Sequence, residues 1–122
     1  MKNQVLSIKQ MQELKELGID TSKASMCWLE TFYTDRTKKF EPEVCNENQR
    51  FDEWCLPAFT LQDILEMLPD IIVNHEVYIP VIQKNFCKYV HNDNSILHLE
   101  VANNTIEAAF NMLKWCKQNN YI

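Results

Sequence analysis

The feature that most constrains the fold is a run of regularly spaced apolar side chains between Asn104 and Ile122. These side chains recur every three or four residues in two adjacent rows, Ile106, Ala109, Phe110, Leu113 and Cys116, and Ala108, Met112 and Trp115. This spacing predicts an amphipathic α-helix, and the two rows give it a wide apolar arc that favours packing against a sheet. Asn104 with Glu107 three residues later is typical of a helix start.

Two shorter helices are predicted earlier in the chain. Apolar residues repeat on one side of residues 7–17, and Gly18 then supplies the left-handed conformation that commonly ends a helix. Between Thr60 and Pro69, a stripe of leucine and isoleucine follows a cap pattern made by Thr60 and Asp63. We expect the C-terminal helix to pack on one face of the sheet and these two shorter helices to lie at the side.

From His75 onward apolar residues occupy alternate positions, which is typical of β-strands. Residues 84–85 and 93–94 offer tight turns between the strands. The pattern therefore predicts a three-stranded antiparallel meander that ends near Val101. Pro80 has no amide hydrogen, so its strand should lie at an edge or direct that position away from the ladder.

The two tight turns also assign the side chains of the meander to two faces, because neighbouring residues of a strand point in opposite directions. We expect the C-terminal helix to cover the aliphatic face, which holds Val77, Ile79, Val81, Val90, Leu97, Leu99 and Val101. The other face should be uncovered and should hold Tyr78, Ile82, Tyr89, His91, Ile96, His98 and Glu100. A recognition surface is therefore predicted on the tyrosine and histidine side.

The middle of the chain has weaker patterns. Cys27 to Tyr33 is rich in aromatic and branched residues and predicts a further strand, whereas Thr34 to Asp52 shows no period and predicts a long polar loop. The sequence as a whole predicts an α+β fold in a single domain, residues 1–122. It consists of a three- to four-stranded antiparallel meander packed by a C-terminal amphipathic helix, with two short additional helices.

Composition excludes several classes of function. The chain has 122 residues and a formal charge of −5, so a dedicated nucleic-acid binder is not expected, because phosphate contacts need a basic surface. Gly18 is the single glycine, whereas phosphate-cradling loops and dinucleotide-binding turns need several. We therefore expect no nucleotide cofactor, and indeed no cofactor of any kind.

The cysteines and the apolar segments bear on location. Five cysteines are widely spaced without a CxxC pair, a pattern that favours reduced thiols in the cytoplasm. The first ten residues lack the continuous apolar segment of a signal peptide, and no stretch approaches the ~20 apolar residues of a membrane span. We expect a cytoplasmic protein that makes no membrane contact.

The strongest constellation of chemically active side chains is His91, His98 and Glu100 on neighbouring strands. Two imidazoles and a carboxylate are ligand types that suit zinc or another divalent ion, but the short ligand spacing of established metal motifs is missing. A cysteine acting as a nucleophile would need a base beside it, and the sequence places none there. A small metal-dependent or thiol enzyme is therefore the alternative hypothesis, and no metal site or catalytic residue is predicted.

The leading hypothesis is a non-enzymatic protein-binding or regulatory module. Aromatic side chains are frequent anchors of protein interfaces, and the predicted partner-binding residues are Tyr78, Tyr89, His91, His98, Trp28 and Phe51. The competing interpretation for most aromatic residues is that they fill the core. A homodimer is also possible, because an edge strand or an uncovered sheet face can pair with a second copy.

The order of several segments resembles a known group of proteins. The segments are ELGI, TSKASM, an aromatic strand, PAFTLQDILEMLP, a small meander and AAFNMLKWCKQNNYI. This layout looks like a group of small uncharacterised proteins found in Bacteroidetes genomes and in their phages and mobile elements. No activity is attached to that group, so the resemblance assigns no site residue. It implies a protein that binds and modulates a host or phage protein, for example as an inhibitor.

Overall fold

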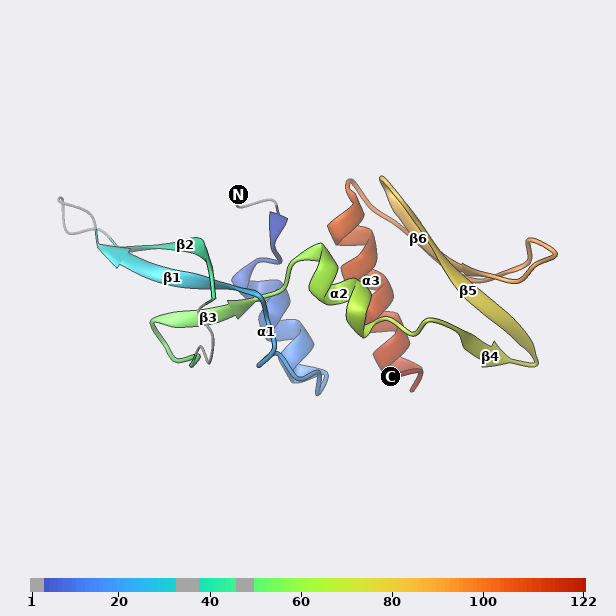
Figure 1. Cartoon of the computed structure of the whole chain (residues 1–122), viewed down its shortest axis with the longest axis horizontal. Coiled ribbons are helices and arrows are strands. Elements are labelled where there is room, and N and C mark those ends of the chain that lie inside the picture. Colours follow the sequence, from blue (N-terminus) through green and yellow to red (C-terminus); the bar gives the residue numbers. More distant parts are fainter. Residues whose placement is uncertain (1–3, 33–37, 46–49) are drawn as a thin grey trace. The chain divides into compact units, whose positions relative to one another are not determined.

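The computed structural model describes residues 4–32, 38–45 and 50–122, and the chain divides into two compact units, Met1–Asp63 and Ile64–Ile122. Each unit contains its own antiparallel sheet, one of three strands and one of four (Figure 1). The predicted α+β class is confirmed. The prediction of a single domain over residues 1–122 stays a prediction. Among the described residues, no helix has both the length and the apolar character required to cross a membrane.

The first unit begins with α1 (Ile8–Glu16), whose two ends match the sequence prediction. Ser7 caps the helix, because its hydroxyl accepts a hydrogen bond from the Gln10 amide while the Gln10 side chain accepts one from the Ser7 amide. Gly18 follows the helix with a φ of 89°, the left-handed conformation that glycine adopts without a steric penalty. Met11 and Leu14 form the buried side of α1.

The sheet of the first unit has the strand order β2-β1-β3 and contains β1 (Met26–Phe32), β2 (Lys38–Val44) and β3 (Cys55–Ala58). The predicted aromatic strand is therefore present as β1, although it belongs to a separate sheet and not to the meander. Trp28 of β1 is buried, and its indole N–H donates to the Leu6 carbonyl at 2.8 Å. Its assignment as a partner-binding residue is wrong, because Trp28 fills the core of this unit.

Part of the predicted polar loop is also a strand. In β2, Phe40, Pro42 and Val44 alternate with charged residues and pair with Glu30, Trp28 and Met26 of β1. Pro42 is tolerated because β2 lies at the edge of the sheet, where an amide donor is not required on both sides. The prediction of a loop is therefore wrong for residues 38–44, and residues 33–37 and 46–49 lie outside the described part of the chain.

The short helix α2 (Leu61–Met67) spans the boundary between the units, and its cap forms as predicted. The Thr60 hydroxyl accepts from the Asp63 amide at 3.1 Å, and the Asp63 carboxylate accepts from the Thr60 amide at 3.0 Å. The same carboxylate accepts from the amide and the hydroxyl of Ser25, at 3.0 and 2.8 Å. Asp63 therefore ties the start of α2 to the residue before β1.

The second unit contains a sheet with the order β4-β5-β6-β7, formed by β4 (Ile72–Asn74), β5 (Glu76–Gln83), β6 (Phe86–Val90) and β7 (Ile96–Val101). The meander is thus confirmed and gains β4 as a strand that the sequence pattern did not predict. Gln83 pairs with Phe86, so the predicted tight turn at residues 84–85 is confirmed. Pro80 lies beyond the part of β5 that pairs with β4, in agreement with its predicted edge position.

The second turn of the meander differs from a regular hairpin. Tyr89 pairs with His98 as expected, but the next pair is Val90 with Ile96, so the register shifts by one residue. Leu97 is the additional residue of this β-bulge. The bulge places Ile96 opposite Val90, on the face that was expected to hold Leu97, and leaves the rest of the register intact.

The C-terminal helix α3 (Thr105–Gln118) packs against β5, β6 and β7, as Figure 1 shows. Its start is confirmed, because the Asn104 side chain accepts from the Glu107 amide at 2.9 Å. The helix covers the opposite face of the sheet from the one predicted. Cys87 and Tyr89 are both 0% exposed, whereas Leu99 is 44% and Val101 64% exposed.

Candidate functional site

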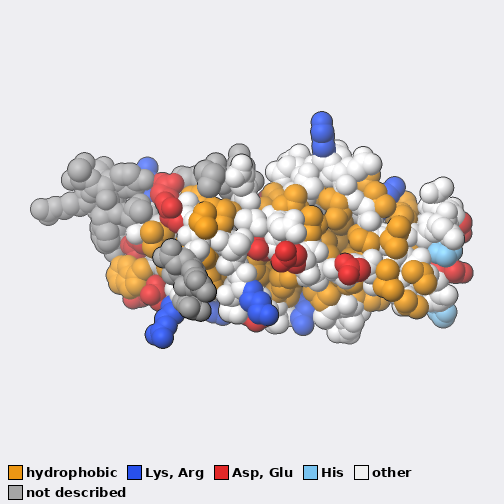
Figure 2. Space-filling view, viewed as in Figure 1, with side chains coloured by type: hydrophobic (Ala, Val, Ile, Leu, Met, Phe, Trp, Pro, Cys, Tyr) orange, Lys and Arg blue, Asp and Glu red, His pale blue; other side chains and the backbone are white. Residues whose placement is uncertain are grey.

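The uncovered face of the four-stranded sheet is almost entirely apolar. The side chains that share it by strand register, which we call the bare face, are Val73, Val77, Ile79, Val81, Gln83, Phe86, Lys88, Val90, Ile96, Leu99 and Val101. Val73 and Ile79 are 67% and 51% exposed. Figure 2 shows hydrophobic side chains at the surface over this sheet. A contiguous apolar surface of this kind is uncommon outside interaction sites.

Lys88 is the one charged side chain of the bare face and lies near its centre. Its strand, β6, is an inner strand, and Lys88 pairs with Val81 on one side and Leu99 on the other. The ammonium lies 5.2 Å from the centre of the Phe86 ring, a cation–π contact that keeps the charge close to the sheet. The bare face therefore combines an aliphatic surface with one central positive charge.

The covered face holds two of the residues predicted to bind a partner. Tyr89 is fully buried, and its hydroxyl donates to the Pro69 carbonyl at 2.8 Å. The His98 ring stacks on Trp115 of α3 with the ring centres 4.1 Å apart and the planes 4° from parallel. The expectation that Tyr89 and His98 lie on the uncovered face is wrong, because α3 packs on that face.

Two further predicted residues, Tyr78 in β5 and His91 directly after β6, lie close to each other. Tyr78 and His91 are half-buried, and their ring centres are 6.0 Å apart. The His91 ring contacts the Val77 carbonyl through Nδ1 at 2.8 Å and the Glu76 carboxylate through Nε2 at 3.3 Å. His91 therefore fastens the end of β6 to β5, and its predicted role as a partner-binding residue stays a prediction.

The proposed metal ligands do not come together. His98 Nε2 lies 3.1 Å from the Glu100 carboxylate, while His91 Nε2 contacts Glu76 instead. Within residues 4–32, 38–45 and 50–122, no group of three histidine, cysteine or acidic side chains is placed to hold a metal ion. Glu100 and His98 thus form a local pair under Trp115 rather than part of a shared ligand set.

The five cysteines form no disulfides, and the surroundings of their thiols do not favour nucleophilic chemistry. Burial raises the pKa of Cys87 to about 11 and the pKa of Cys116 to about 12. In the first unit burial likewise raises the pKa of Cys55 to about 12 and raises the pKa values of Cys27 and Cys45. Thiols with raised pKa values stay protonated near neutral pH, and the protonated form is a poor nucleophile.

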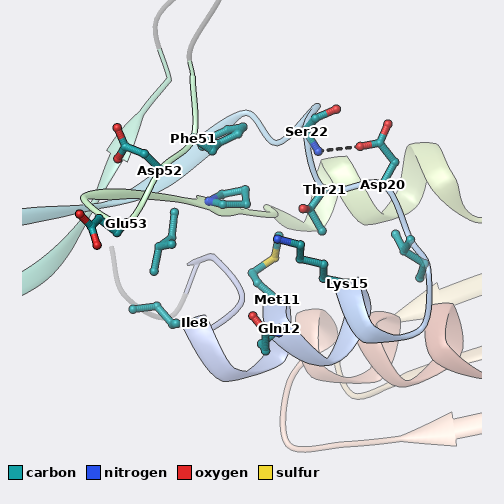
Figure 3. A pocket seen from close by; sticks show the side chains of 13 residues that line it. Ile8, Met11, Gln12, Lys15, Asp20, Thr21, Ser22, Phe51, Asp52 and Glu53 are labelled. Atoms are coloured by element: carbon teal, nitrogen blue, oxygen red, sulfur yellow. Dashed lines mark hydrogen bonds between the residues drawn. The ribbon is translucent and has the colours of Figure 1, made fainter.

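Phe51, the last predicted partner-binding residue, is half-buried in the first unit. It lines a pocket formed by α1, the loop after α1 and the segment that leads into β3 (Figure 3). The sequence offered no signal for this pocket, because its lining comes from three separate segments. The exposed aliphatic residues of the bare face were likewise missed as functional candidates, although alternation placed all of them except Val73 and Ile96 together on one face.

Comparison with models of protein families, with curated proteins and with solved structures finds no match to this chain. The observations that bear on function are those of the chain itself. They are the exposed aliphatic sheet face with its central lysine in the second unit, and the pocket beside α1 in the first unit.

Proposed function

We propose that this chain is a non-enzymatic protein-binding module whose partner docks on the bare face of the four-stranded sheet. The single observation that carries this proposal is the exposure of that face, where Val73, Ile79 and Val101 are more than half exposed. Covering apolar surface contributes about 25 cal/mol per Å², so a partner that covers these side chains gains a large driving force. An enzymatic role is supported by no comparable observation.

The chemistry of the face selects the kind of partner. Lys88 would be taken out of water at the centre of the interface, and a lysine that is buried without an opposite charge is costly. A complementary partner therefore presents an apolar surface with an aspartate or glutamate opposite Lys88. The aliphatic rows supply the affinity, and the charge pair fixes the orientation of the two proteins.

A second copy of the chain is a poorer occupant. No acidic side chain belongs to the bare face, so two copies that met through it would bury two copies of Lys88 without a carboxylate to pair with either. Like charges brought together in an apolar interface oppose association. We therefore favour a different protein over a homodimer. The resemblance to proteins of phages and mobile elements further suggests that the partner is a host or phage protein, which this chain modulates.

The test is to compare capture of proteins by four versions of the purified full-length chain from a lysate of cells that carry its gene. The versions are wild type, Lys88→Glu, Leu99→Asp and a control, Lys84→Glu, which makes the same charge change in the exposed β5–β6 turn. We expect a protein that wild type and Lys84→Glu both retain and that Lys88→Glu and Leu99→Asp retain at least about tenfold less, since removal of an interface anchor typically exceeds ~1.4 kcal/mol.

Circular dichroism of each variant checks that the fold is retained, and light scattering on wild type measures its mass in solution. A partner that Lys88→Glu retains as well as wild type does would overturn the charge assignment. A homodimer that Leu99→Asp dissociates would overturn the preference for a different protein. Equal capture by all four versions would overturn the proposal as a whole.

A further inference from the structure

The first unit contains a pocket of about 570 Å³ that the protein-binding proposal does not use. This volume lies within the ~300–1,000 Å³ typical of small-molecule sites. One wall is α1 with Ile8, Met11 and Lys15, and the opposite wall is Phe51 with the start of β3 (Figure 3). The pocket lies wholly within residues 8–57, so the first unit alone forms it.

Most of the lining is apolar. Met11 and Ile19 are buried beneath the pocket, and Ile8, Phe51, Leu56 and Pro57 complete the apolar surface. Such a lining suits a ligand with a hydrocarbon or aromatic body, because burial of apolar surface is the main source of affinity for small ligands.

Polar groups line both ends of the pocket, with Lys15, Asp20 and Thr21 at one end and Asp52 and Glu53 at the other. Figure 3 shows Lys15 with its ammonium directed inward, on the side of the pocket where Thr21 lies. Among the described residues, no ion pair joins Lys15 to an acidic side chain of the chain. The ammonium of Lys15 and the hydroxyl of Thr21 are therefore available as donors to a ligand at this end.

Two carboxylates of the pocket serve the backbone instead. The Asp20 carboxylate accepts from the Ser22 amide at 2.9 Å, and this hydrogen bond lowers the pKa of Asp20. One Asp52 oxygen accepts from the Trp54 and Cys55 amides, at 2.8 and 3.0 Å. In Figure 3 the carboxylates of Asp52 and Glu53 lie at the end of the pocket away from Lys15.

From this arrangement we infer that the pocket binds a small apolar monocarboxylate, with its carboxylate at Lys15 and Thr21 and its apolar body between Ile8 and Phe51. The ammonium pairs with one negative charge. The carboxylates of Asp52 and Glu53 repel a second negative charge at the far end, so dicarboxylates are disfavoured.

Three probes with the same hydrocarbon tail test the inference, namely octanoate, 1-octanol and octylamine. Amide chemical shifts of the full-length protein, followed by NMR during titration, report both the affinity and the location of binding. We expect octanoate to perturb residues 15–22 in a saturable way and to bind at least about threefold more tightly than octanol, the size expected for a partly exposed charge pair. Octylamine should bind more weakly than octanol.

Lys15→Met should remove the preference for octanoate over octanol. Lys9→Met is the matched control, because Lys9 is exposed on the same helix but does not line the pocket. Equal affinities for octanoate and octanol in wild type would overturn the inference. Shifts confined to the bare face of the second unit, or an octanoate preference that survives Lys15→Met, would overturn it as well.

Discussion

The two faces of the four-stranded sheet are both rich in apolar side chains, yet only one is covered. Cys87 and Tyr89 on the covered face are fully buried, whereas Val73 and Val101 on the bare face are 67% and 64% exposed. Apolar content alone therefore does not decide which side of a sheet a helix covers. Side chains of the covered face make directional contacts that fix the position of the elements packed on it, and the aliphatic face has no such contacts.

Three such contacts hold elements of the second unit to the covered face. The Tyr89 hydroxyl donates to the Pro69 carbonyl, and His98 stacks on Trp115. The Asn74 amide donates to the Tyr121 hydroxyl at 3.1 Å. The Tyr89 hydrogen bond satisfies a hydroxyl that would be costly to bury without a partner. A purely aliphatic face has no equivalent means of fixing the position of α3.

Truncation of a side chain to alanine should lower the free energy of unfolding much more on the covered face than on the bare face, and this is the largest expected difference between the two faces. Tyr89→Ala should cost about 3–5 kcal/mol, because it leaves a large cavity under α3 and an unpaired Pro69 carbonyl. Leu99→Ala, on the bare face, should cost less than about 1 kcal/mol. Urea denaturation of the two variants measures both values, and similar costs would mean that the faces are not distinguished by burial.

A smaller effect is expected when the buried thiol of the covered face loses its proton. Burial raises the pKa of Cys87 from 9.0 to about 11, so the unfolded chain releases this proton first. The contribution of Cys87 to stability is therefore complete below pH 9 and is lost as the pH rises towards about 11. At about pH 10.5 the loss should approach ~2 kcal/mol relative to about pH 8.

Urea denaturation at both pH values tests this effect, with Cys87→Ala as the comparison. Other groups titrate in the same range in both proteins, so the informative quantity is the difference between their pH-dependent losses. The variant should lose less stability than wild type by about the stated amount. Identical losses would show that the Cys87 thiol is not desolvated in the folded state.

A milder change tests the hydrogen bond of the covered face. Tyr89→Phe keeps the ring but removes the donor to the Pro69 carbonyl, so it should cost about 1–2 kcal/mol. Tyr78→Phe serves as the matched control, since Tyr78 is half-buried in β5 of the same sheet. Thermal unfolding should place Tyr89→Phe below both wild type and the control. A transition unchanged from wild type would indicate that the Tyr89 hydroxyl contributes no net stability.

The smallest effect on stability is expected from polar substitutions on the bare face. The double variant Ile79→Thr, Leu99→Thr places threonine, a β-branched residue that favours strands, at two exposed strand positions. The midpoint of thermal unfolding should therefore change little. The same double variant should bind a dye such as ANS less strongly than wild type. A loss of more than about 2 kcal/mol would show that these side chains are covered within the folded protein.

Much of the second unit could be predicted from the sequence. Residue spacing located the C-terminal helix and its Asn104 cap, and the turn at residues 84–85 gave the pairing of Gln83 with Phe86. Alternation groups side chains by face, but it does not state which group is buried when both are apolar. The stacking of His98 on Trp115 depends on tertiary placement, so it could not be read from spacing.

The first unit was less predictable. In β2, Phe40 and Val44 alternate with charged residues, but Pro42 and the polar neighbourhood concealed the strand. The sheet depends on pairing between segments far apart in sequence, such as Cys55 with Leu29. The pocket beside α1 arises from that pairing. The sequence gives the types of its lining residues but does not predict that they come together.

Site-specific photo-crosslinking in cells that carry the gene tests whether a different protein docks on the bare face. A benzophenone amino acid is placed at Leu99 on the bare face, and at Glu16 as an exposed control position on α1. We predict a covalent adduct with a second, different protein from position 99, absent from position 16 and lost when Lys88→Glu is added. An adduct formed equally at both positions, or formed at position 99 only with another copy of this chain, would contradict the account.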